Sequence, residues 1–227
     1  MGSAGRFVRE TALTAGSQSP VVYVVDADMS ARDSLESMVC REGWELAAFS
    51  SAQEFLSHPW AFAPSCLVLD IALPDISGLE LQRHIAAARR DIPVIFVTGS
   101  SNIAMAVQAM KAGAIEFFTK PFEGKDLLDA IRCAIVISRN ALRQEAQLCA
   151  LRERYETLSR REREVMALVV SGRMNKQVGG DLGISEITVK AHRGRAMQKM
   201  EAASLAHLVT IAATLAVGSP QSETRAA

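Results

Sequence analysis

Four short apolar runs, each leading into a polar residue, constrain this chain more than any other feature of its sequence. The runs cover 21–25, 66–69, 94–97 and 115–119, and they lead into Asp26, Asp70, Thr98 and Lys120. Continuous apolar runs that alternate with helical stretches are typical of buried parallel strands. Because parallel strands end at one edge of an open sheet, where ligands bind, we expect these side chains to converge. Two carboxylates, a hydroxyl and an ammonium group there suit metal-assisted transfer of a phosphoryl group onto an aspartate.

The stretch 20–125 alternates strand and helix five times. A further strand is expected at 44–49, and the expected helices lie at 30–42, 51–57, 78–88 and 102–110. Ser30 can cap the first of these helices, and Gly43 can end it. Five such units predict an α/β first domain with a doubly wound, flavodoxin-like sheet.

A long helical stretch follows this domain. Neither Gly nor Pro occurs between Lys125 and Ser171, and apolar residues recur there at helical spacings. We interpret 126–157 as a linker helix. The alternative is a final helix of the first domain followed by a looser linker.

The stretch 158–217 has a purely helical pattern. Ser159-Arg160-Arg161-Glu162 is a capping box that begins a helix through Val170. Further helices are expected at 175–182, 185–200 and 204–217, with Gly183 in the turn before the second of these. The helix after this turn carries Lys190, Arg193, Arg195 and Lys199. This pattern predicts an all-α, four-helix domain with a DNA-binding helix-turn-helix.

Three glycines should weaken this domain. Gly194 lies in the middle of the expected DNA-facing helix, and Gly179-Gly180 lie in the helix that supports it. Each should cost about 1 kcal/mol of helix stability relative to alanine. We therefore expect a marginally stable domain with limited direct reading of bases, which relies on phosphate contacts and on dimerisation.

Charge distinguishes the two halves of the chain, although the whole chain has a formal net charge of zero. Residues 20–125 carry 13 acidic against 8 basic side chains, whereas residues 152–217 carry 11 basic against 7 acidic. This asymmetry favours a polyanionic partner for the second half. The four cysteines show no spacing typical of a zinc site.

The two ends of the chain carry little structural signal. The stretch 1–19 lacks the apolar segment of a secretory signal, so we expect none there. We expect 1–19 to be a disordered extension and 218–227 to be a disordered tail. The most apolar late stretch, 202–217, is too short to span a membrane. We expect a soluble, cytoplasmic protein with no membrane partner.

Seven segments together resemble a known family. They are Asp70–Gly78, Val97-Thr98-Gly99, Lys111–Ala114, Phe118–Phe122, Leu158–Glu162, Asn175–Val178 and Thr188–His192. In this order they resemble two-component response regulators of the FixJ-like subgroup of the NarL/LuxR family. The resemblance covers about 21–216 and implies a receiver domain followed by a LuxR-type helix-turn-helix.

The resemblance implies a role for each residue at the expected sheet edge. Asp70 would accept the phosphoryl group from a partner sensor histidine kinase. Lys120, which would precede a cis peptide bond to Pro121, would balance the negative charge of the phosphoryl oxygens. Thr98 would follow the phosphoryl oxygens, and Phe117 would be the aromatic switch. Mg²⁺ would be held by Asp26, Asp70 and the backbone carbonyl of Ala72.

One position departs from the family pattern. The family has two adjacent acids at the end of the first strand, whereas this chain has Asp26-Ala27, with Asp28 as a candidate substitute ligand. Alanine offers no ligand atom, so we predict weakened Mg²⁺ binding. The alternative is a regulator that binds DNA independently of phosphorylation because its receiver is degenerate.

The resemblance also implies contacts for the second domain. The residues concerned are Lys190, Thr188, Arg193, Arg195, Asn175, Lys176, Ser185 and His192. Lys190 would be the leading base or phosphate contact, Asn175 and Lys176 would meet the DNA backbone, and His192 would pack or meet a phosphate. The last helix would form a homodimer on phosphorylation. RNA polymerase is a further candidate partner. Activation of transcription is commoner than repression among proteins that resemble this chain, so we expect activation.

A second class of function would make the chain an enzyme. Val25-Asp26-Ala27-Asp28 matches the motif that follows the first strand in phosphatases of the haloacid dehalogenase type, in which Asp26 would be the nucleophile. We disfavour this alternative, because it leaves Asp70 and the entire second domain without a role.

Overall fold

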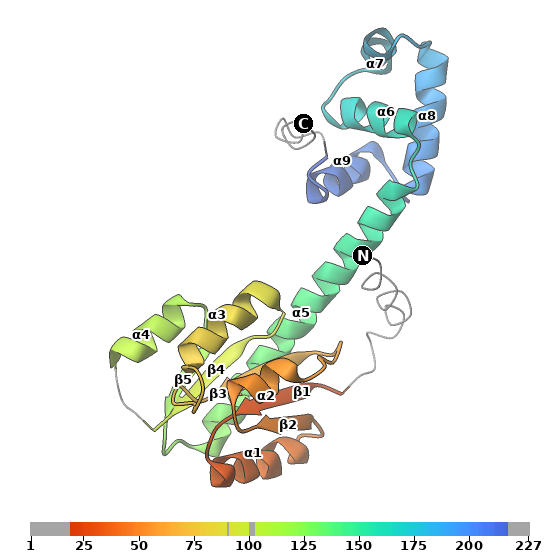
Figure 1. The fold of residues 1–227 in the computed structure, drawn as a ribbon. Coiled ribbons are helices and arrows are strands. Elements are labelled where there is room, and N and C mark those ends of the chain that lie inside the picture. The colour runs from red at the N-terminus through yellow and green to blue at the C-terminus, as the bar shows by residue number, and fades with distance from the viewer. Residues whose placement is uncertain (1–18, 90, 100–102, 218–227) are drawn as a thin grey trace. The chain divides into compact units, whose positions relative to one another are not determined.

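The computed structural model describes residues 19–89, 91–99 and 103–217. The disorder expected at the two ends therefore lies, apart from Ser19, outside the described residues, as does the expected helix start at Asn102. The chain divides into two compact units between Arg143 and Gln144 (Figure 1).

The first unit is built on a parallel sheet with the strand order β2-β1-β3-β4-β5. The strands are β1 (Val21–Val25), β2 (Glu45–Phe49), β3 (Ser65–Leu69), β4 (Val94–Thr98) and β5 (Glu116–Thr119). This order is that of flavodoxin-like sheets. The predicted fold class is therefore confirmed for this unit.

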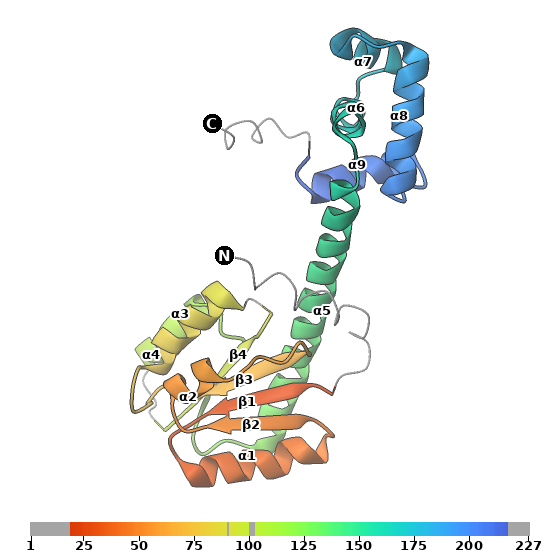
Figure 2. The same cartoon turned by 45° about the vertical axis from the view of Figure 1, so that its right-hand side comes forward.

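Helices cover both faces of this sheet. They are α1 (Met29–Arg41), α2 (Ala52–Ser57), α3 (Gly78–Ala88), α4 (Ile103–Lys111) and the beginning of α5 (Gly124–Glu156). Alternate residues of a strand point to opposite faces. Tyr23 therefore belongs to the apolar cluster that includes residues of α2, α3 and α4, whereas Val24 belongs to the cluster that includes residues of α1 and α5. Figure 2 shows the sheet between these two groups of helices.

Helix α5 is continuous over 33 residues, which confirms the long helix rather than the looser linker. Its first turns belong to the core of the first unit, because Leu127, Ile131 and Ile135 are buried against the sheet. The hydroxyl of the buried Ser138 accepts a hydrogen bond of 2.9 Å from the backbone N–H of Ser65, at the start of β3. The domain boundaries proposed from the sequence stay predictions.

The second unit is helical throughout, as predicted. It contains the end of α5, then α6 (Arg160–Val170), α7 (Asn175–Leu182), α8 (Glu186–Lys199) and α9 (Leu205–Thr214). One apolar cluster joins α6, α8 and α9, and a second joins α6, α7 and α8. Among the described residues, none of the helices has the length and apolar character needed to cross a membrane.

Candidate functional site

The four polar residues that end the apolar runs meet at the carboxyl edge of the sheet. Asp26 follows β1, Asp70 follows β3, Thr98 ends β4 and Lys120 follows β5. Backbone hydrogen bonds fix these strand ends, because Asp70 N donates to the Val25 carbonyl over 2.9 Å and Lys120 N to the Thr98 carbonyl over 2.7 Å. The sheet thus brings together residues that are far apart in the sequence.

Lys120 joins the two carboxylates. Its Nζ lies 2.5 Å from Oδ2 of Asp26 and 3.4 Å from Oδ2 of Asp70. Burial by itself lowers the pKa of Lys120, but hydrogen bonds and charge from both aspartates outweigh burial and raise that pKa above its ordinary value. The ammonium group therefore stays charged at neutral pH.

Asp70 is held in place without being covered. Its Oδ1 accepts a 3.0 Å hydrogen bond from Ala72 N, while its side chain stays 12% exposed. Gly78, at the start of α3, allows this geometry, because a Cβ there would lie 2.3 Å from the Asp70 carbonyl oxygen. Asp70 thus has a fixed carboxylate that an incoming group can reach.

The flanking residues occupy the expected places. Thr98 is buried, at 2% exposed, and Phe117 is half-buried, with its ring centroid 6.4 Å from that of Phe96. The Lys120-Pro121 bond is cis, as expected. The switching roles of Thr98 and Phe117 stay predictions.

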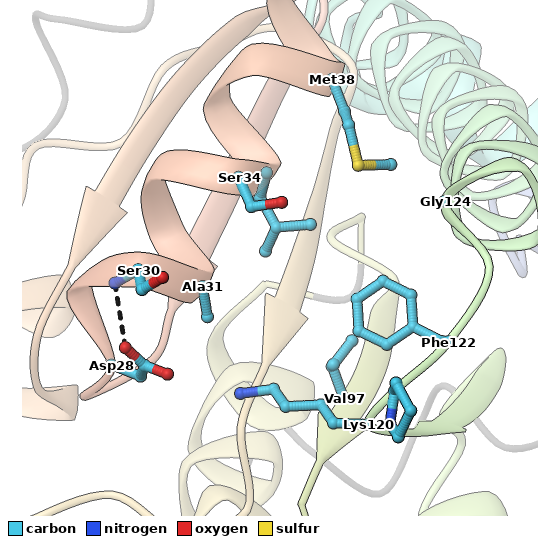
Figure 3. Close-up of a pocket in the computed structure, with 11 residues that line it drawn as sticks. Asp28, Ser30, Ala31, Ser34, Met38, Val97, Lys120, Phe122 and Gly124 are labelled. Carbon is cyan, nitrogen blue, oxygen red and sulfur yellow. Dashed lines mark hydrogen bonds between the residues drawn. The ribbon is translucent and has the colours of Figure 1, made fainter.

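The donor set for Mg²⁺ is small. Ala27 offers no ligand atom. Asp28, rather than the expected Ser30, caps α1, because its Oδ1 accepts from Ser30 N over 2.9 Å (Figure 3), and a ligand role for its other oxygen stays a prediction. Within the described residues, no group of three or more His, Cys, Asp or Glu side chains is arranged to hold a metal. The predicted donors Asp26, Asp70 and the Ala72 carbonyl suit a Mg²⁺ ion that keeps several of its water molecules.

A pocket of about 390 Å³ opens beside Lys120, between α1 and the turn from β5 to α5. Asp28 and Ser30 line one end, and Met38, Phe122 and Gly124 line the other. In Figure 3, the Lys120 side chain extends toward the first turn of α1. The edge is therefore open to a partner on this side.

The phosphatase alternative finds no support in this geometry. Its nucleophile would be Asp26, which is 3% exposed. Both oxygens of that carboxylate have partners, since Oδ1 accepts from Asp28 N and Oδ2 from Lys120. The accessible carboxylate of the pair is Asp70.

The second unit contains the predicted helix-turn-helix. Gly183 ends α7 with a left-handed φ of 68°, and Ser185 caps α8 by accepting from Thr188 N over 3.1 Å. Our expectation that Gly179 weakens this unit is wrong, because a Cβ there would lie 2.7 Å from the Ile184 carbonyl oxygen. Gly179 allows α7 to approach the turn closely. Gly180 and Gly194 have open space instead.

The predicted DNA-contact residues differ in availability. Lys176, Ser185, Lys190 and Arg195 are exposed, whereas Thr188, Asn175, His192 and Arg193 are half-buried. Lys190 pairs with Glu186 at 3.2 Å, and the hydroxyls of Ser185 and Thr188 bond each other at 2.8 Å. The guanidinium of Arg193 reaches Asn175 on α7 at 3.5 Å, so two of the predicted contact residues bond each other.

Lys199 has a structural partner that the sequence did not reveal. Its Nζ lies 2.7 Å from the buried carboxylate of Glu162 and 3.0 Å from the Thr157 carbonyl oxygen. Glu162 also completes the predicted capping box by accepting from Ser159 N at 2.8 Å. This bond ties the end of α8 to the start of α6.

We expect Glu162→Ala to destabilise the second unit by about 2 kcal/mol, because it removes both a cap and a charged hydrogen bond. Glu164→Gln should change stability by less than about 0.5 kcal/mol, because Glu164 pairs with Arg160 and Arg161 at the surface. Urea unfolding followed by far-UV circular dichroism measures both variants. Equal unfolding midpoints for the two would contradict this assignment.

The contribution of Glu162 should depend on pH. The hydrogen bond from Lys199 lowers the pKa of Glu162 below its ordinary value of 4.5, and it outweighs burial, which acts the other way. Its contribution is therefore full above pH 4.5 and is lost as the pH falls through the lowered pKa. The difference in stability between wild type and Glu162→Gln should accordingly shrink in acid.

Other side chains also escaped the sequence interpretation. Arg32 on α1 donates to the Asp26 carbonyl oxygen at 2.5 Å, and Asp75 accepts from the N–H groups of Ala52 and Gln53 at the start of α2. The only sequence signal for Asp75 was its place in the loop after β3. Its partners lie more than twenty residues away, so no local pattern predicts them.

Comparison with known proteins supports the fold of the first unit and that of the second. A family model described as the response regulator receiver domain matches residues 22–132, and one described as bacterial regulatory proteins of the luxR family matches residues 156–212. Nodulation protein W of Bradyrhizobium diazoefficiens is 45% identical over 212 residues, which are 92% of each chain. The chain belongs to the response regulators with a luxR-type DNA-binding domain.

Further relatives of this response regulator confirm the FixJ-like resemblance. The transcriptional regulatory protein FixJ of Rhizobium meliloti is 42% identical over 198 residues, which are 84% of this chain and 94% of that protein. The structure of the response regulator StyR matches 86% of this chain and 99% of its own, with 42% identity and a TM-score of 0.77. This family regulates transcription, and its receiver domains bind Mg²⁺ at the phosphorylation site.

Proposed function

We propose that this response regulator accepts a phosphoryl group on Asp70 from a partner histidine kinase and then dimerises and binds specific DNA. Activation of transcription is the expected output. The observation that carries the proposal is the meeting of Lys120 with Asp26 and Asp70, at 2.5 and 3.4 Å, beside an accessible Asp70 carboxylate. This arrangement supplies a nucleophile and a fixed cation at one open edge.

The proposed chemistry is a displacement at phosphorus. An oxygen of Asp70 attacks the phosphorus of a phosphohistidine, the P–N bond breaks, and the P–O bond of an aspartyl phosphate forms. The imidazole leaves with the electron pair. Lys120 stabilises the phosphoryl oxygens as a point charge.

Mg²⁺ would be held by Asp26, Asp70 and the Ala72 carbonyl. When bound, it would offset the negative charge that gathers between the carboxylates and the phosphoryl group. Because Ala27 adds no ligand and Asp28 already uses one oxygen to cap α1, this chain should hold the ion less tightly than a receiver with two adjacent acids.

Phosphorylation would then shift a two-state equilibrium. Thr98 lies at the end of β4 and can supply its hydroxyl to the phosphoryl group, and the half-buried Phe117 on β5 can follow it. A change of this kind works by stabilising one existing conformation over another. The proposed outcome is dimerisation.

The second unit would deliver the output in the cytoplasm. Its exposed cations, including Lys176, Lys190 and Arg195, suit DNA phosphates. Leu205 and Val209 on α9 are 37% and 41% exposed, which supports a homodimer formed through the last helix. RNA polymerase remains a candidate partner in this proposal.

The test measures DNA affinity with and without phosphorylation. A duplex selected from a random library with the full chain is titrated by fluorescence anisotropy, before and after treatment with acetyl phosphate and Mg²⁺. We expect affinity to rise about tenfold, a usual size for coupling between two sites. Asp70→Asn should show no such rise.

One observation favours a second candidate function. Ala27 reduces the metal donor set, and one oxygen of Asp28 is engaged at the cap of α1, which suits a regulator that binds DNA without phosphorylation. In that case the untreated and treated proteins would bind the duplex equally well. The same titration therefore separates the two candidates.

A further inference from the structure

We propose that Ile187 determines sequence specificity by packing against thymine methyl groups in the major groove of DNA. The inference deepens the proposed function and rests on it. Ile187 lies in the first turn of α8, and it is 81% exposed. N-terminal residues of a recognition helix are the ones that reach base edges.

Ile187 lies at the N-terminal end of α8, on the central line of its exposed face. Residues 187, 191, 194 and 198 are all exposed and follow the spacing of one helical face, while Val189 and Ala196 are buried on the opposite side. The centre of this face is therefore isoleucine, alanine, glycine and glutamine. It carries no charge.

Cations flank this uncharged centre. At about 100° per residue, Lys190 and Arg195 lie on opposite sides of the line through Ile187 and Gly194, and both side chains are exposed. A groove with phosphates along both walls and bases along its floor matches this order of charges. The flanking charges therefore favour DNA over a protein as the occupant.

Gly194 leaves room for a close approach. Nothing in the protein lies within 4 Å of a Cβ built there, and its φ lies outside the left-handed region. The protein itself thus does not require glycine at this position, in contrast to Gly179. A helix with small residues at 191 and 194 can lie deep in a groove, which brings Ile187 close to the bases.

The polar side chains next to Ile187 contact one another. The hydroxyls of Ser185 and Thr188 bond each other at 2.8 Å, and Glu186 pairs with Lys190. Ile187 has neither a donor nor an acceptor, so the feature of a base edge that it can recognise is the thymine methyl group. This assigns base reading through apolar contact to Ile187.

The experiment pairs a protein variant with a DNA variant. Full-length wild type selects its duplex from a random library, and each thymine of that duplex is replaced in turn by uracil, which lacks only the methyl group. At one or more positions in the half of the duplex that each protomer contacts, uracil should weaken wild-type binding about fourfold. This is the loss in affinity expected when one methyl group is no longer buried. Ile187→Ala should bind the thymine and uracil duplexes equally.

Two control variants test whether the loss of thymine preference is specific to Ile187. Met174→Ala removes another exposed apolar side chain of the same unit, 67% exposed, and should keep the wild-type preference for thymine. Lys190→Ala should weaken binding to both duplexes alike. Circular dichroism verifies that each variant is folded.

Different outcomes overturn different claims. If wild type binds specifically but tolerates uracil at every position, or if Ile187→Ala keeps the preference for thymine, the inference fails and the proposed function stands. If wild type selects no sequence at all, treated or untreated, the proposed function fails and takes this inference with it.

Discussion

Replacing Asp70 with asparagine should abolish phosphorylation of this response regulator. Intact mass spectrometry after treatment with acetyl phosphate and Mg²⁺ should show the gain of one phosphoryl group on wild type and none on Asp70→Asn. The physical reason is that an amide is a far weaker nucleophile than a carboxylate. Asparagine still accepts the hydrogen bond from Ala72 N, so the loop after β3 should keep its structure.

Asp75→Asn is the matched control for this prediction. Asp75 lies in the same loop, but its carboxylate accepts from Ala52 N and Gln53 N at the start of α2. This variant should still gain one phosphoryl group. An equal gain on Asp70→Asn would place the acceptor elsewhere, and no gain on wild type would favour the phosphorylation-independent candidate.

Ala27→Asp should strengthen Mg²⁺ binding about tenfold or more, because affinity follows the number of charged oxygen ligands. Ala27 is exposed and directly follows Asp26, so a carboxylate fits there without displacing the core. Without Mg²⁺ the added charge should lower thermal stability by repulsion. Added Mg²⁺ should restore that stability, because it binds the folded state.

Isothermal titration calorimetry suits this measurement. Trp44 and Trp60 precede β2 and β3, at the amino ends of the strands. Their fluorescence would therefore report on the edge of the sheet opposite the proposed metal site. Ala27→Asn is the control: it has nearly the size of aspartate without its charge, and it should gain little affinity. Identical Mg²⁺ affinity in wild type and Ala27→Asp would show that the missing acid does not limit metal binding.

The sequence by itself determined the sheet edge and the order of the helices. Apolar runs, capping residues and glycine turns are local signals, and the parallel arrangement of strands carries Asp26, Asp70, Thr98 and Lys120 to one edge. The helix-turn-helix followed in the same way from Gly183, Ser185 and the cations after them. These features required no knowledge of distant contacts.

Only the tertiary structure decided what each of these side chains touches. Lys120 lies nearer to Asp26 than to Asp70, Lys199 bonds the buried Glu162, and Gly179 leaves space that a Cβ would take from the Ile184 carbonyl oxygen. Helical periodicity defines the faces of a helix, but the neighbours that cover each face come from other parts of the chain. Residues that are distant in sequence come into contact only when helices and strands pack together. No local sequence pattern predicts those contacts.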